Sequence, residues 1–185
     1  MYAKDQDITS LAFMLSDRRI TAVDLLRDQF DEIARRDADL CCFVEVDEAG
    51  ATLAALESDQ RRKNGAPLSA LDGIPIALKD NINAKGLSTR NGSKYNHSVT
   101  ADAAVTQKLR AAGAVLLGKL NMDECAIGGT TDNPHYGRTF NPWKPGFVPG
   151  GSSGGARAKG SMRAKIIARV CFSGRRRRTR APRNE

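Results

Sequence analysis

The chain has no apolar run near the 20 residues that a membrane-spanning helix requires, and it has no signal-like N-terminus. Its four cysteines, Cys41, Cys42, Cys125 and Cys171, have none of the paired spacing that is typical of metal ligands. We interpret each of them as a small buried apolar side chain. These absences predict a reduced, soluble, cytoplasmic protein without a cysteine metal site.

The sequence also contains only an incomplete match to the motif of a magnesium-binding phosphate loop. The segment 113–120 has the glycine and lysine spacing of such a loop up to Lys119, but Leu120 stands where a serine or threonine would bind magnesium. The interior of the segment is a continuous apolar run, which is typical of a buried strand. We therefore interpret Lys119 as part of the fold and not as a phosphate ligand.

The positive charge of the chain is concentrated at one end. With 185 residues there is room for one domain, and the formal net charge is +8. Residues 1–155 hold 18 Lys and Arg against 20 Asp and Glu, whereas residues 156–185 hold 11 against one. The body of the chain is therefore mildly acidic, and nucleic-acid binding is expected only through the tail.

The body predicts an α/β fold in which helices surround a mixed β-sheet. Thr21 is the expected N-cap of a helix that ends near Arg36, because apolar residues then recur at helical spacing. A second helix is expected over 48–63 and a strand over 74–78. Pro75 predicts that this strand lies at an edge or does not pair at its start.

A third helix and a second strand follow. Asp102 is the expected cap of a helix over 103–112, and Gly113 its end. The apolar segment 114–117 predicts a buried strand, with a loop from Gly118. Residues 128–155 are rich in Gly, Pro, Asn and Thr and predict a long loop of the kind that usually carries function.

Three motifs occur in order along this body: residues 71–81 (LDGIPIALKDN), residues 121–124 (NMDE), and Asn-Pro-Trp at 141–143 leading to Pro-Gly-Gly-Ser-Ser-Gly-Gly at 149–155. Together they resemble the N-terminal part of the amidase signature family. The resemblance implies an α/β amidase domain, here incomplete, that cleaves carboxamide C–N bonds of a small-molecule substrate without a metal or other cofactor. A homodimer stays open as the assembly of this chain.

Carried over motif by motif, the resemblance gives Lys79 the role of the base and Ser152 that of a bridging serine held by a cis peptide bond. Ser153 is implied as a hydrogen-bonding neighbour at the same site. A lysine can act as a base only when its amine is neutral, and a neighbouring Asp80 carboxylate would oppose that if the two side chains met. The resemblance further implies a substrate-binding role for Gly128, Gly129, Thr130, Gly150 and Gly151.

The nucleophile of the family is missing from its place. The family carries it about two dozen residues beyond the bridging serine, in a run resembling Gly-Ser-Asp-Thr-Gly-Gly-Ser, where this chain has Arg175–Arg178. We therefore expect a truncated, inactive amidase-type hydrolase of residues 1–155. Residues 156–185 are expected to be an out-of-frame or disordered basic tail.

Several alternatives stay open. The chain could be the A subunit of a glutamyl-tRNA(Gln) or aspartyl-tRNA(Asn) amidotransferase, which needs partner subunits, although residues 133–137 favour a stand-alone amidase. It could be a non-catalytic polypeptide whose basic tail binds RNA phosphates or an acidic membrane. His97 and His135 would suggest a Ser–His hydrolase, and Cys125 with Glu124 and Lys79 a nitrilase-like trio. The three ordered motifs favour the serine amidase over both.

Overall fold

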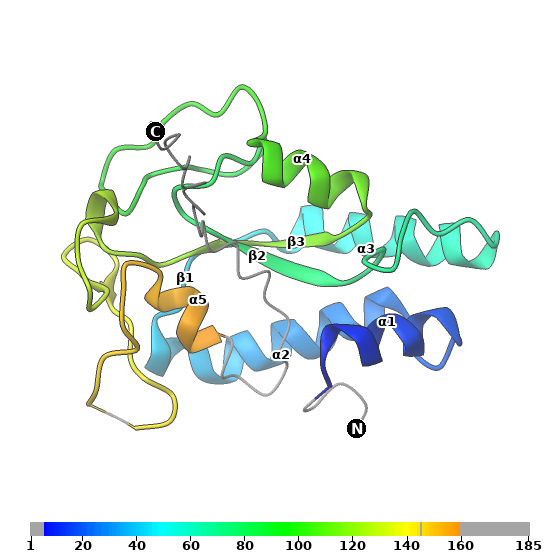
Figure 1. Cartoon of the computed structure of the whole chain (residues 1–185), viewed down its shortest axis with the longest axis horizontal. Coiled ribbons are helices and arrows are strands. Elements are labelled where there is room, and N and C mark those ends of the chain that lie inside the picture. The colour runs from blue at the N-terminus through cyan, green and yellow to red at the C-terminus, as the bar shows by residue number, and fades with distance from the viewer. Residues whose placement is uncertain (1–5, 145, 160–185) are drawn as a thin grey trace, which may run out of the picture.

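A computed structural model of the chain describes residues 6–144 and 146–159 (Figure 1). Over these residues five α-helices, one 3-10 helix and five short strands follow each other along the chain. In order they are α1 (Ile8–Ser16), α2 (Ala22–Leu40), β1 (Phe43–Val46), α3 (Glu48–Lys63), β2 (Pro75–Lys79), α4 (Ala104–Ala111), β3 (Val115–Leu120), the 3-10 helix η1 (Glu124–Ala126), β4 (Asp132–Asn133), β5 (Gly137–Arg138) and α5 (Gly154–Lys159).

The main sheet is mixed, as the sequence predicts. Its strand order is β1-β3-β2, in which β3 pairs antiparallel with β1 and parallel with β2. β2, which begins at Pro75, occupies an outer position among the described strands. A separate two-stranded sheet joins β4 to β5. The parallel pair brings the carboxyl ends of β2 and β3 to the same edge, where the motif residues lie.

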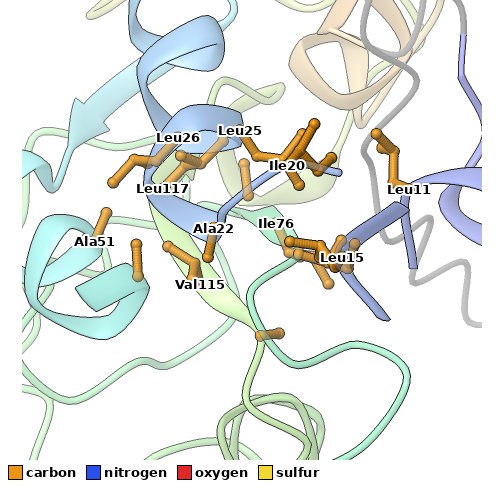
Figure 2. Packing of buried hydrophobic residues seen from close by; sticks show 14 of the residues in the cluster. Leu11, Leu15, Ile20, Ala22, Leu25, Leu26, Ala51, Ile76, Val115 and Leu117 are labelled. Carbon is orange, nitrogen blue, oxygen red and sulfur yellow. The ribbon is translucent and has the colours of Figure 1, made fainter. Parts of the chain in front are cut away.

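Both faces of the sheet are buried. On one face Ala77 and Leu117 pack in a cluster with apolar residues of α1 and α2, among them Leu15 and Leu25, which Figure 2 labels. On the other face Leu78 and Leu116 form a second cluster, against which Leu109 of α4 packs. In Figure 1 α1 and α2 lie below the strands and α4 above them. Layers on both faces are what an α/β domain requires.

The first helices form where their caps predict. The Thr21 hydroxyl accepts the Asp24 N–H at 3.0 Å and the Asp24 carboxylate accepts the Thr21 N–H at 3.2 Å, a complete capping box. α2 then continues past Arg36 to Leu40. α3 is confirmed over residues 48–63, with the Asp47 side chain accepting the Gly50 N–H at 2.9 Å.

Two expectations about helix and strand ends were wrong. Asp102 does not cap α4, because its carboxylate accepts the Lys85 N–H at 2.6 Å and pairs with Arg110 at 3.1 Å, while Ala103 begins the helix without a side-chain cap. Gly118 does not end the second strand but lies inside β3. It has a φ of +143°, and a Cβ there would overlap the Glu45 carbonyl of β1. Glycine at 118 therefore permits the close approach of β1 and β3.

The boundary expected at residue 155 falls inside α5. Beyond this boundary, Ala158 and Lys159 are buried. Residues 160–185, on which the expectation of a basic disordered tail mainly rests, lie outside the described residues. Within the part that is described, no helix is both long enough and apolar enough to cross a membrane.

Candidate active site

The side chains of Lys79 and Ser152 meet across 73 positions of sequence. Lys79 ends β2, and Ser152 precedes α5, which packs against β2. The Lys79 Nζ donates a hydrogen bond to Ser152 Oγ at 2.7 Å. The peptide bond between Gly151 and Ser152 is cis, as the family resemblance implied. Two of the expected catalytic residues are thus in direct contact, and both are partly exposed.

The main chain of Ser152 is held by the loop that follows β3. The Asp123 N–H donates to the Ser152 carbonyl at 3.1 Å. The Gly155 N–H similarly donates to the Asn121 carbonyl at 3.1 Å. The Ser152 backbone is therefore attached to the end of β3, while its side chain contacts the end of β2. Ser153 lies beside it, directly before α5, and its carbonyl accepts the Arg157 N–H at 3.1 Å.

Of the expected substrate-binding residues, Gly128 and Gly151 lie against the Asp123 side chain, and Gly151 also lies against the backbone of Gly129 and Thr130. A Cβ on Gly151 would overlap Asp123 Oδ2 and would lie 2.7 Å from the carbonyl carbon of Gly129 and 2.8 Å from Thr130 N. Gly128 lies against the same carboxyl group: a Cβ on Gly128 would lie 2.5 Å from Asp123 Cγ. The glycines were expected to let a substrate approach the backbone. At Gly151 the structure gives a different reason, which is that two loops of the protein itself approach each other there.

Thr131 joins the same two loops and was not identified from the sequence. It is fully buried, its Oγ1 donates to the Gly150 carbonyl at 3.2 Å, and it accepts the Gly154 N–H at 2.9 Å. Its own N–H donates to Asp123 Oδ1 at 2.9 Å. No sequence signal distinguishes it from its neighbour Thr130. Asp123 belongs to a motif that the sequence singles out, but nothing in that motif gives its role.

The Asp80 carboxylate, which follows Lys79 directly, is fully buried and is held by main-chain donors. Its Oδ2 accepts the Gly92 N–H at 2.9 Å and its Oδ1 accepts the Arg90 N–H at 3.4 Å. The ammonium of Lys119 lies 3.6 Å from Oδ1. The carboxylate is thus bound within the 88–92 turn.

Of the other candidate groups, Glu124 and Cys125 lie in η1 and His135 lies between β4 and β5. His135 Nε2 and Glu124 Oε1 are 3.1 Å apart. Cys42 is buried as expected, but Cys125 is exposed, so the expectation that each cysteine is a buried side chain was wrong there. In the described part of the chain no cluster of three or more His, Cys, Asp or Glu side chains could hold a metal ion. The segment 175–178, where the family nucleophile is expected, lies outside the described residues.

Comparison with known proteins gives a consistent result. A family model described as Amidase matches residues 24–167, a range that continues past residue 155. The chain is 44% identical over 150 residues to the glutamyl-tRNA(Gln) amidotransferase A subunit of Acidothermus cellulolyticus, and 40% identical over 160 residues to its counterpart in Myxococcus xanthus. These alignments cover 80% and 85% of this chain but 30% and 33% of the relatives. The chain therefore spans about a third of the length of the curated relatives that it matches.

Solved structures resemble the same part of the chain. The peptide amidase from Stenotrophomonas maltophilia is 32% identical with a TM-score of 0.76, over 82% of this chain and 33% of the peptide amidase. A structure described as that of an amidase has 31% identity and a TM-score of 0.78, over 85% of this chain and 36% of its own. A vestigial complex related to an s-triazine catabolic enzyme has 38% identity and a TM-score of 0.79, over 82% and 34%.

Proposed function

Because the chain belongs to the amidase signature family, we propose that it carries the lysine base and the bridging serine of a carboxamide hydrolase and lacks the attacking serine. The observation that supports this proposal is the 2.7 Å hydrogen bond between Lys79 Nζ and Ser152 Oγ. The serine that such a site needs is absent from its expected position at 175–178. The chain alone is therefore a piece of an amidase that does not turn over amides.

In the proposed mechanism Lys79 is the terminal proton acceptor. Its neutral amine takes the hydroxyl proton of Ser152, while Ser152 Oγ takes the proton of the attacking serine. That serine forms a bond to the amide carbonyl carbon, the C–N bond breaks, and the leaving nitrogen receives the proton back through Ser152. Water then resolves the acyl-enzyme. Ser153 and the glycines at 128, 129, 150 and 151 with Thr130 would border the substrate.

A chimera tests the proposal. In the Stenotrophomonas maltophilia peptide amidase, the matching N-terminal segment is replaced by residues 1–155 of this chain, so that the attacking serine comes from the remainder. We expect the chimera to hydrolyse a peptide amide, and Lys79→Ala or Ser152→Ala to lower kcat by at least about 100-fold. Lys108→Ala, which alters an exposed lysine of α4, is the matched control and should leave the rate unchanged. A folded chimera that is inactive, or one that keeps its rate without Lys79, would contradict the proposal.

A second candidate is a piece of an amidotransferase A subunit. The names of the Acidothermus cellulolyticus and Myxococcus xanthus relatives favour it, whereas the sequence at 133–137 favours a stand-alone amidase. The two candidates differ in their partners, because only the amidotransferase component requires other subunits. Co-purification of the chain with those subunits would support the second candidate, and its purification alone or as a homodimer would support the first.

A further inference from the structure

Two lysines lie at the carboxyl ends of the paired strands β2 and β3, and they point to opposite faces of the sheet. Leu78 pairs with Lys119, and Lys79 pairs with Leu120. Because side chains alternate along a strand, Lys119 shares the face of Leu78, whereas Lys79 projects from the other face. The two amines therefore act in different environments, although their strands are adjacent.

Lys119 is fully buried and fully hydrogen-bonded. Its Nζ donates to the Ser88 carbonyl at 2.8 Å, to Thr89 Oγ1 at 3.0 Å and to the Asp80 carbonyl at 3.1 Å. Three acceptors match the three protons of an ammonium group, whereas a neutral amine has only two protons to donate. The geometry thus fits a charged Lys119 whose counter-ion is the Asp80 carboxylate, 3.6 Å away.

Asp80 is the main counter-ion of Lys119, because the other charged groups near Lys119 pair with each other. Glu45 and Arg90 also face Lys119, but they pair with each other at 2.8 Å. Burial lowers the pKa of Lys119, and the Asp80 carboxylate opposes that effect. Asp80 also accepts the N–H groups of Arg90 and Gly92, so the carboxylate organises the 88–92 turn.

We propose that Lys119 is a positioning residue for the Lys79–Ser152 pair, because it binds and neutralises the carboxylate of Asp80, the residue next to Lys79. The proposal rests on the proposed function, in which the Lys79 amine must be neutral to accept a proton. An uncompensated carboxylate on the next residue would favour the ammonium form, because opposite charges stabilise each other. Lys119 allows Asp80 to hold the 88–92 turn without keeping Lys79 protonated.

The test measures the pH at which the Lys79 amine loses its proton, in the full 185-residue chain, by NMR of the lysine Cε–Hε signals. Exposed Lys108 is the internal reference. In Lys119→Met the midpoint of Lys79 should rise by about one pH unit, because the Asp80 charge is then uncompensated. In Asp80→Asn it should fall by about the same amount, because Lys119 is then uncompensated.

The double variant Asp80→Asn/Lys119→Met removes both charges and should return the midpoint to that of the unaltered chain. Lys63→Met, which removes an exposed lysine of α3, is the matched control and should not move it. If Lys119→Met does not fold, the Lys79 midpoints of Asp80→Asn and of the double variant test the proposal. Folded variants in which the Lys79 midpoint does not move, or moves in the opposite direction, would overturn the proposal.

The failure of this inference can be distinguished from the failure of the proposed function. If Lys79 of the unaltered chain titrates together with Lys108, the role of Lys79 as the base is contradicted. If Lys79 titrates well below Lys108 but does not respond to residues 80 and 119, only the role of Lys119 is contradicted.

Discussion

The α-carbon of Gly151 lies against the carboxylate of Asp123, so closely that a Cβ at residue 151 would overlap Asp123 Oδ2. The same Cβ would meet the backbone of residues 129 and 130, which cannot rotate away as a side chain can. This contact joins the loop after β3 to the loop that carries Ser152. The first prediction follows from it.

Gly151→Ala should destabilise the chain by about 3 kcal/mol, because overpacking against backbone forces the two loops apart. The measurement is the urea midpoint of unfolding. Gly129→Ala is the matched control, because a Cβ there meets nothing within 4 Å, and it should change the free energy of unfolding by less than about 0.5 kcal/mol. Equal effects of the two substitutions would contradict the packing that we describe.

Thr131→Val should cost about 1–3 kcal/mol of stability, because valine keeps the shape and the β-branch of the side chain but leaves the Gly150 carbonyl and the Gly154 N–H without the hydroxyl partner. Thr131→Ser keeps the hydroxyl and should retain most of the stability. The comparison of the two variants by thermal unfolding separates the hydrogen bonds from the packing. A valine variant as stable as the unaltered chain would show that the hydroxyl does not hold the loops together.

Lys159→Met should stabilise the chain at neutral pH. Lys159 is fully buried at the end of α5, where its Nζ donates to Gln29 Oε1 at 2.9 Å. Burial lowers the pKa of Lys159 to about 8, against the rise that the Cys42 and Asp37 charges would cause. A decrease of more than two units from the usual value near 10.4 makes the charged form cost about 3 kcal/mol at pH 7. After subtraction of about 1 kcal/mol for the Gln29 hydrogen bond, a gain of about 2 kcal/mol is expected.

The gain should depend on pH in a defined direction. Below pH 8 both the folded and the unfolded chain carry the Lys159 charge, so the full cost is present. Between about pH 8 and pH 10.5 the folded chain binds fewer protons than the unfolded chain, so the cost disappears as the pH rises. Because burial raises the pKa of Cys42, which acts in the opposite direction, the two chains are compared at each pH by urea unfolding. An advantage of Lys159→Met that is constant from pH 7 to pH 10.5 would contradict the assignment.

The purified 185-residue chain should not hydrolyse simple aliphatic or aryl amides, because no serine occupies the place of the family nucleophile. Release of ammonia or of a chromogenic amine measures this directly. Turnover that is abolished by Lys79→Ala would show that another residue of this chain attacks the amide carbonyl.

Some elements could be predicted from the sequence because their signals are local. The capping box at Thr21 and the helical spacing of apolar residues defined α2, and the apolar run after Gly73 defined β2. β1 gave no such signal, because its four residues are all half-buried and its pairing contains a bulge. Gly118 was misinterpreted because a glycine usually ends a strand, and only the position of β1 shows why one lies inside β3.

In the site, too, some contacts could be predicted from sequence motifs, whereas others depend on how the loops pack. The contact between Lys79 and Ser152 was predicted from motifs that resemble a known family, although 73 positions separate the two residues. The roles of Asp123 and Thr131 depend on which loops meet in space, and neither residue type nor spacing reveals that. Asp80 was expected to oppose a neutral Lys79 only if the two side chains met, and its burial against Lys119 was not foreseeable from the chain alone.

The central claim is that Lys79 is a base whose proton passes through Ser152, and the titration of the Lys79 amine in the unaltered chain tests it most directly. The account predicts a midpoint below that of exposed Lys108, since a base must be neutral near the working pH. A Lys79 amine that keeps its proton up to the same pH as Lys108, or to a higher one, would contradict the account.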